Sequence, residues 1–130
     1  MKYLLLLIFI WSCSRISVPS DKDLSDFKGD VYVSTLKEMI SDTSIYVKSN
    51  SKIYLNDSLA FIFVDTLTPQ KLFVKEILKN DNNTVVYWLS YNEKKTTTDA
   101  NIYVESKTDS IYIQYVVENE IKIFHNCYKK

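Results

Sequence analysis

The feature that most constrains this chain is a series of short apolar runs separated by clusters of Asn, Asp, Ser, Thr and Lys, from about Phe27 to Tyr128. The runs are rich in Tyr, Ile and Val, which are the aromatic and β-branched residues that fit a pleated strand. We therefore expect a single small β-rich domain over residues 27–130. Its predicted fold is mainly β, an antiparallel meander with one or two short helices, and an α+β fold is the alternative.

The C-terminal third predicts a three-stranded meander in detail. A turn at Thr108-Asp109 and a three-residue loop over 118–120 place the same residues of the middle strand on one face, as the period of two requires. The predicted pairs are Ser106–Ile111, Val104–Ile113 and Ile102–Tyr115 across the first turn, and Val117–Ile121, Tyr115–Ile123, Ile113–His125 and Ile111–Cys127 across the second. Earlier strands are expected over Ser44–Lys48, Lys52–Asn56, Leu59–Asp65 and Thr84–Tyr91.

Two segments carry helix signals. Thr35-Leu36-Lys37-Glu38 has the form of a capping box, in which Thr and Glu satisfy each other's backbone amides. Thr68-Pro69 offers an N-cap followed by Pro at the first helical position. The apolar residues after it share one helical face, so we expect a helix over 69–79, with a strand as the alternative.

The N-terminus has the layout of a secretory signal. One cation, Lys2, precedes nine apolar residues over 3–11, and polar residues follow at once. Nine residues are too few to span a bilayer, which needs about 20. A first strand of a cytosolic protein is the alternative interpretation of this segment.

The end of this leader, Ile10-Trp11-Ser12-Cys13, resembles the lipobox of bacterial lipoproteins. The resemblance implies that residues 1–12 are a cleaved signal peptide and that Cys13 carries the lipid. Two or more acyl chains anchor a protein stably to a membrane. Ser14 after the Cys implies the outer membrane where the cell has one. Residues 13–26 are then a flexible tether, and ordinary signal cleavage after Ser14 is the alternative.

Composition excludes several function classes. A formal net charge of zero argues against a nucleic-acid partner. A single glycine, Gly29, leaves no room for glycine-rich phosphate loops. One His and two Cys are too few for a zinc site made of nitrogen and sulfur. We expect neither a metal nor a cofactor.

The predicted meander sets out one candidate binding face. Four aromatic residues alternate there with polar ones, and they are Tyr103, Tyr112, Phe124 and Tyr128. Tyrosines among polar groups suit recognition because each has a rigid apolar body and a hydrogen-bonding tip. The expected function is therefore a non-catalytic, lipid-anchored binding module of the cell envelope, with a protein or glycan partner.

The alternative function is a small envelope hydrolase. His125 and Cys127 lie two residues apart and suggest a thiol–imidazole pair, and a pair of carboxylates such as Asp57 and Asp65 is the other candidate. The predicted register turns both His125 and Cys127 toward the aliphatic face, where a buried thiol is inert. Lipidation of Cys13 would leave Cys127 without a disulfide partner, whereas a free Cys13 could bridge to it. A solvent-accessible His125 at the floor of a pocket with a carboxylate near it would favour the enzyme, whereas a His125 packed among Ile111, Ile113 and Ile123 would favour the binding module.

Overall fold

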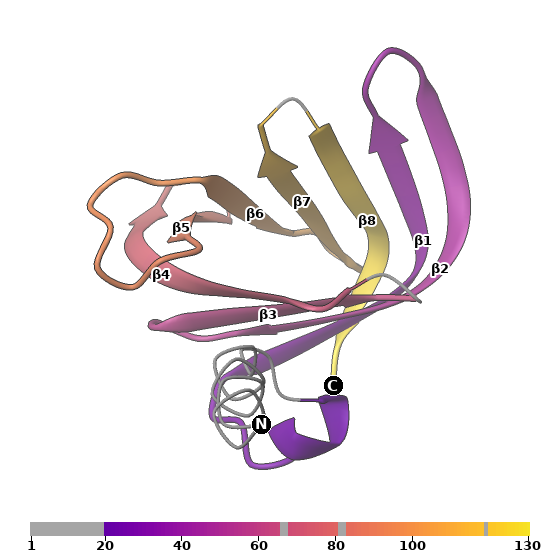
Figure 1. Cartoon of the computed structure of the whole chain (residues 1–130). Coiled ribbons are helices and arrows are strands. Elements are labelled where there is room, and N and C mark those ends of the chain that lie inside the picture. Colours follow the sequence, from indigo (N-terminus) through magenta and orange to yellow (C-terminus); the bar gives the residue numbers. More distant parts are fainter. Residues whose placement is uncertain (1–19, 66–67, 81–82, 119) are drawn as a thin grey trace, which may run out of the picture.

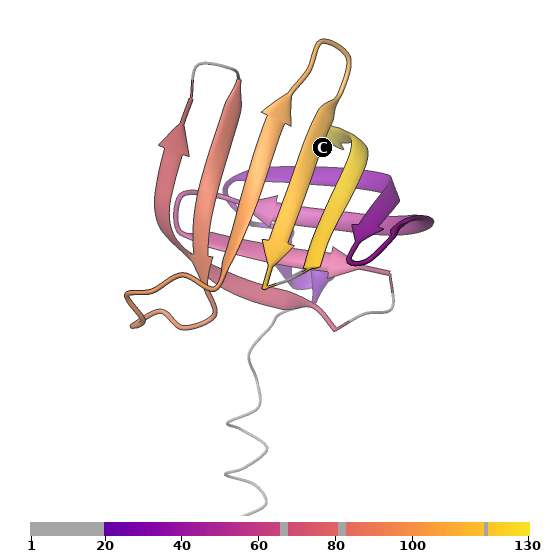
Figure 2. The same cartoon turned by 90° about the horizontal axis from the view of Figure 1, so that it is seen from above.

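The computed structural model describes residues 20–65, 68–80, 83–118 and 120–130, and these ranges are almost entirely β-strand (Figure 1). The elements are η1 (Asp21–Leu24), β1 (Asp30–Ile40), β2 (Ser44–Leu55), β3 (Leu59–Val64), β4 (Gln70–Lys79), β5 (Thr84–Ser90), β6 (Ala100–Ser106), β7 (Ile111–Val117) and β8 (Glu120–Lys129). Each strand pairs antiparallel with the next, and β8 returns to pair with β1. The predicted fold class, a mainly β antiparallel meander, is confirmed, and the meander closes into a barrel (Figure 2).

The barrel interior holds the main core. Every second residue of a strand points inward, so the apolar residues at these positions of all eight strands meet on the axis. The largest fully buried apolar side chains there are Phe124, Ile53, Leu55, Leu72, Leu89, Ile102 and Ile113. The alternation of apolar and polar residues that predicted the strands therefore also places the apolar side chains inside the barrel.

A second cluster lies on the outer face of β2 and β3. Leu24 and Phe27 of the N-terminal segment pack against Tyr54 and Phe61, and the Phe27 ring meets both aromatic rings edge to face. Leu24 is 9% exposed, so the packed part of the chain includes residues assigned to the tether. This packing corrects the predicted boundary between residues 26 and 27.

Two segments that carried helix signals are strands. The segment 35–38 belongs to β1, and the segment 69–79 contains all of β4. In β4 the register shifts between Val74 and Glu76, so the inward positions change phase there. Because of that change, the apolar residues Phe73, Val74, Ile77 and Leu78 have the spacing of one face of a helix.

One of the four predicted pairs between β7 and β8 is present. Ile111 pairs with Cys127 as predicted, and all three predicted β6–β7 pairs are present. The pairs nearer the turn are displaced by one residue, because Ile113 faces Phe124 rather than His125. A bulge between these two points supplies the extra residue, and Asn126 there has a positive φ of 51°.

The predicted strands Ser44–Lys48 and Lys52–Asn56 form one long strand, β2. β2 has 12 residues, whereas β3 has only six. The two strands therefore pair only over residues 51–55 of β2. Asp65, with a φ of 46°, ends β3 and turns the chain away. The Asp65 amide donates to the Asn50 carbonyl at 2.9 Å, and the Asn50 amide donates to the Asp65 carboxylate at 2.7 Å. Within the described part of the chain, residues 44–48 therefore pair with β1 alone.

Candidate functional site

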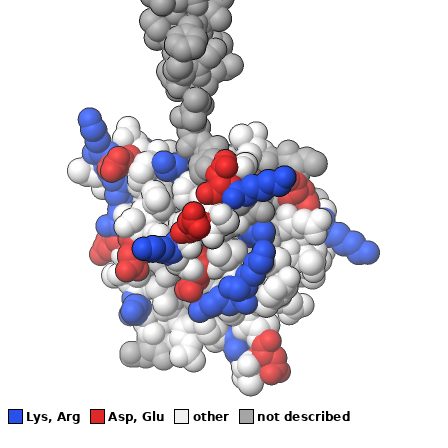
Figure 3. Space-filling view, turned by 90° about the horizontal axis from the view of Figure 1, so that it is seen from below, with Lys and Arg blue, Asp and Glu red and all other residues white. Residues whose placement is uncertain are grey.

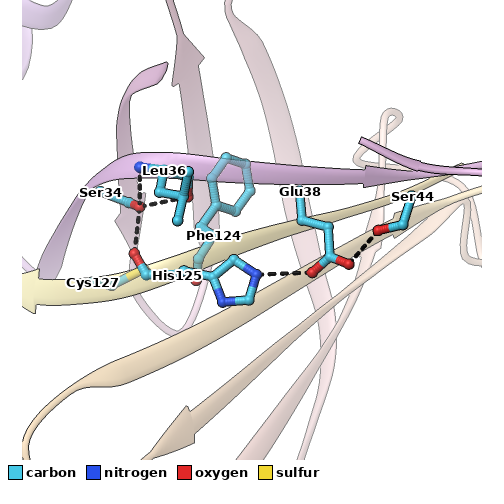
Figure 4. Close-up of polar contacts among 7 residues, drawn as sticks. All are labelled: Ser34, Leu36, Glu38, Ser44, Phe124, His125 and Cys127. Carbon is cyan, nitrogen blue, oxygen red and sulfur yellow. Dashed lines mark hydrogen bonds and ion pairs between the residues drawn. The ribbon is translucent and has the colours of Figure 1, made fainter. Parts of the chain in front are cut away.

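Five polar and aromatic side chains meet on the outer face where β2, β1, β8 and β7 lie side by side. We call Glu38, Ser44, Tyr46, Tyr112 and His125 the imidazole cluster. His125 Nε2 lies 2.8 Å from Glu38 Oε2, and the Ser44 hydroxyl donates to the other carboxylate oxygen (Figure 4). The rings of Tyr46 and Tyr112 flank the imidazole at centroid distances of 5.9 and 5.6 Å.

A local irregularity in β1 and β8 sets the direction of His125. Ser34 Oγ lies 2.7 Å from the His125 carbonyl oxygen and accepts a hydrogen bond from the Leu36 amide (Figure 4). The buried Ser34 side chain thus satisfies backbone groups that the regular ladder leaves open. With the strand phase changed here, Phe124 points into the barrel and the neighbouring His125 points out.

Hydrogen bonds stabilise the charged form of Glu38. The Ser44 hydroxyl first, and the His125 imidazole second, hold the pKa of this carboxyl below its usual value. Burial raises the pKa of Tyr112 above that of a free phenol, and the charge of Glu38 adds to this effect. Because Ser44 donates to the carboxylate, its proton is not directed at the imidazole, and the contact that activates a serine nucleophile is not formed.

The predicted binding face is only partly assembled. Tyr103 and Tyr112 are half-buried on the outer face, and Tyr128 is 57% exposed. Phe124 is fully buried in the core, which corrects its place in that face. The bulge in β8 inverts the direction of Phe124 relative to the predicted register.

The thiol–imidazole pair of the alternative function is not formed. Cys127 points into the core and is 2% exposed, and burial raises the pKa of its thiol to about 11. His125 lies on the outer face with 26% of its side chain exposed, which corrects its predicted position opposite Ile113. The two side chains therefore lie on opposite sides of the barrel wall.

The carboxylates proposed as an acid–base pair are also apart. Asp57 precedes β3 and Asp65 follows it, so the six residues of the strand separate them. At about 3.3 Å per residue this is about 20 Å, well beyond the spacing at which two carboxylates share a reaction. In the described ranges no three His, Cys, Asp or Glu side chains are grouped to hold a metal ion.

One candidate surface was missed by the sequence analysis, and it is the unpaired part of β2. Three consecutive apolar residues are exposed there, Ile45 at 55%, Tyr46 at 63% and Val47 at 38%. We call residues 44–49 of β2 the free edge, since the structure, over the residues that it describes, places no neighbouring strand along their side away from β1. Figure 1 shows the β1–β2 hairpin extending beyond the neighbouring strands. The sequence signal for this surface was the run of three apolar residues, because successive side chains of a strand point to opposite faces and such a run makes both faces of the strand apolar.

Basic and acidic side chains are interspersed on the face that Figure 3 shows, so this face has no patch of a single charge sign. Cys13 and the predicted signal peptide lie outside the described residues, so their predicted roles stay predictions. Among the described residues, no helix is long and apolar enough to cross a bilayer. Comparisons of the chain with protein-family models, curated proteins and solved structures give no match.

Proposed function

We propose that this chain is a lipid-anchored protein of a bacterial envelope whose barrel is a non-catalytic interaction module. In this proposal the free edge of β2 binds an extended segment of a partner protein, which adds a strand to the sheet. The observation that carries it is the run of exposed apolar residues along an unpaired strand edge. Soluble proteins normally cover or charge such an edge, because it is a template for pairing with another chain.

The geometry of the edge favours a protein partner over a glycan. A bound strand would hydrogen-bond to the backbone of residues 44–49, which a sugar ring cannot do along its whole length. Tyr46 shares the outer face with Glu38, whereas Ile45 and Val47 lie on the inner face. An alternating apolar segment would therefore find contacts on both sides of the hairpin.

A second copy of the chain is the less suitable occupant. Two barrels that met only along these six residues would bury far less than the roughly 1,200 Å² of a stable interface. A flexible segment can follow the edge and also bend over the exposed faces of the hairpin. Ser44 and Tyr46 of the imidazole cluster belong to this edge, so the rest of the cluster would extend the contact on the outer face.

The enzyme alternative has weaker support. His125 is partly exposed and has a carboxylate beside it, which is one feature that a hydrolase needs. Its potential thiol partner is buried on the other side of the wall, and the nearby serine is bound to the carboxylate. The cluster thus has a positioned imidazole without a nucleophile.

The edge can be tested by site-specific photo-crosslinking in the native envelope. A photoreactive phenylalanine analogue at Tyr46 is expected to form an adduct with one partner protein, and Tyr46→Lys is expected to abolish its copurification. Tyr91, which is 46% exposed on the β5–β6 connection, supplies the matched control for both changes. A self-adduct, or equal adducts at both positions, would refute the edge as a binding site.

The anchor is tested separately. Metabolic labelling with palmitate is expected to label the wild-type chain, and Cys13→Ala is expected to remove the label and release the protein from the membrane fraction. Cys127→Ala is the matched control, because its thiol is buried in the barrel. Label retained in Cys13→Ala would overturn the proposed anchor without affecting the test of the edge.

A further inference from the structure

Alternate residues of the free edge direct their backbone groups to the side of β2 away from β1. The amide of Asn50 donates to the Asp65 carboxylate, and the carbonyl of Asn50 accepts the Asp65 amide, so both backbone groups of Asn50 point toward β3. Residues of one strand that share a face also share the direction of their N–H and C=O groups. Ser44, Tyr46 and Lys48 share the face of Asn50, and their backbone groups therefore point into the line along which β3 would continue.

The two faces of the free edge differ in chemistry. On the outer face Tyr46 pairs with Glu38 of the imidazole cluster, and Lys48 lies two residues further along the same face. On the inner face Ile45 and Val47 are apolar and at least 38% exposed. A strand added along this edge would therefore place alternate side chains beside a tyrosine and a lysine on one face, and beside two aliphatic residues on the other.

The ring of Tyr46 is suited to bind a cation. It is 63% exposed, and its centroid lies 5.9 Å from that of the His125 ring, which contacts the Glu38 carboxylate (Figure 4). A cation over the face of a tyrosine is attracted to its π electrons, and the charge of Glu38 adds to this attraction. The ring on the β7 side of the same imidazole already has such a contact, since Lys107 Nζ lies 4.9 Å from the centroid of Tyr112.

A basic side chain on an added strand can use both the ring and the carboxylate. Neighbouring strands lie about 4.8 Å apart, so a residue opposite Tyr46 would be two strand spacings from Glu38, or about 10 Å. A lysine or arginine whose stem lies along the Tyr46 ring crosses most of this distance and brings its charge toward Glu38. Lys48 sets the opposite requirement, because it is exposed and an acidic residue opposite it forms a favourable cross-strand pair.

We propose that the partner segment pairs antiparallel with β2 and carries a basic residue opposite Tyr46, an acidic residue opposite Lys48 and apolar residues at the positions between. This inference rests on the strand addition proposed above and adds the chemistry of the partner. The antiparallel direction follows because the segment continues the line of β3, and β2 pairs antiparallel with both of its neighbours. From its N-terminus the segment then reads acidic, apolar, basic, apolar.

The test is the fluorescence anisotropy of labelled peptides that bind the full chain in detergent. The peptide Thr-Glu-Val-Lys-Val-Thr is expected to bind about fivefold more tightly than the same peptide with Met in place of Lys. Tyr46→Leu keeps an apolar side chain at the edge and is expected to equalise the two affinities. Tyr91→Leu, at a position that is 46% exposed on the β5–β6 connection, is the matched control and is expected to keep the preference. N-methyl groups on the Glu and Lys amides of the peptide, which would face β2, are expected to abolish binding, whereas N-methyl groups on the Val amides are not.

The charge pattern and the free edge fail in different ways. Equal affinities of the Lys and Met peptides for the wild type, with binding still blocked by N-methyl groups at the charged positions, would overturn the charge pattern and leave the edge intact. A preference for the Lys peptide that persists in Tyr46→Leu would also overturn it, because the cation would then lie elsewhere. No binding of any peptide, or equal binding of the two N-methylated forms, would overturn the free edge itself and this inference with it.

Discussion

The middle of the barrel and its end at the β2–β3 separation are built from the same strands but differ in pairing and polarity. In the middle each strand has a neighbour on both sides, and the inward residues are large and apolar, as at Leu89 and Ile102. At the end β2 loses one neighbour, and the inward residues include Lys37 and Lys122. The middle therefore supplies the stability that allows the end to keep an open edge and inward-pointing lysines.

The comparison predicts a large difference between core and edge substitutions. Phe124→Ala removes a ring that is fully buried in the barrel core, and it should lower the free energy of unfolding by about 3–5 kcal/mol. Tyr46→Ala removes an equally large side chain that is 63% exposed, and it should change stability by no more than about 0.5 kcal/mol. Urea unfolding measures both values, and similar losses would show that the hairpin is part of the stabilising core.

The N-terminal segment should make an intermediate contribution. Leu24→Ala removes the side chain that is 9% exposed between this segment and the outer face of the barrel. We expect a loss of about 2 kcal/mol, at the low end for a buried leucine, because the small outer cluster can relax. Lys22→Ala, at an exposed position of the same segment, is the control. If Leu24→Ala leaves the free energy of unfolding unchanged, residues 20–26 act as the predicted flexible tether.

Replacing Lys37 should raise the free energy of unfolding, in contrast to the core substitutions. Lys37→Met keeps most of the side-chain volume and removes the ammonium group of a residue that is 5% exposed. We expect a gain of about 1 kcal/mol, since removing a charge from water is unfavourable. Thermal unfolding of the variant measures it. A clear loss of stability would mean that the charge of Lys37 is satisfied in the folded protein.

The strand content and one hairpin register could be predicted because they follow from local alternation. The β6–β7 pairs are correct, since both strands keep an unbroken period of two. The two false helices and the slipped β8 register share one cause, a change of phase within a strand. Such bulges depend on neighbouring strands that the local sequence does not reveal, although Asn126, in the left-handed region, is a residue type that permits one.

The candidate sites were harder to predict because they depend on closure of the barrel. Tyr103 and Tyr112 were placed correctly by alternation alone, whereas Glu38 meets His125 only because β8 returns to β1, 87 residues away. The free edge of β2 follows from the short length of β3, which leaves residues 44–49 without a second neighbour. The run of three apolar residues in β2 signals two apolar faces, but it does not reveal the missing neighbour.

The smallest expected effect concerns the pH dependence of the imidazole cluster. The Ser44 hydroxyl and the imidazole lower the pKa of Glu38 in the folded protein, whereas the unfolded chain has an ordinary carboxyl pKa of about 4.3. The unfolded state therefore binds more protons in acid. The contribution of Glu38 to stability is fully present above the unfolded value and is lost as the pH falls through the lower folded value.

Glu38→Gln should accordingly flatten the fall of stability between about pH 5 and pH 3, with little change in slope near neutrality. The measurement is the urea midpoint as a function of pH, compared with Glu76→Gln at an exposed position of β4. A slope unchanged by Glu38→Gln would show that the carboxylate gains nothing from its contacts in the fold. The hairpin would then be linked to the barrel by strand pairing alone, and the contrast between the stabilising middle and the open end would be sharper than the hydrogen bonds of the cluster indicate.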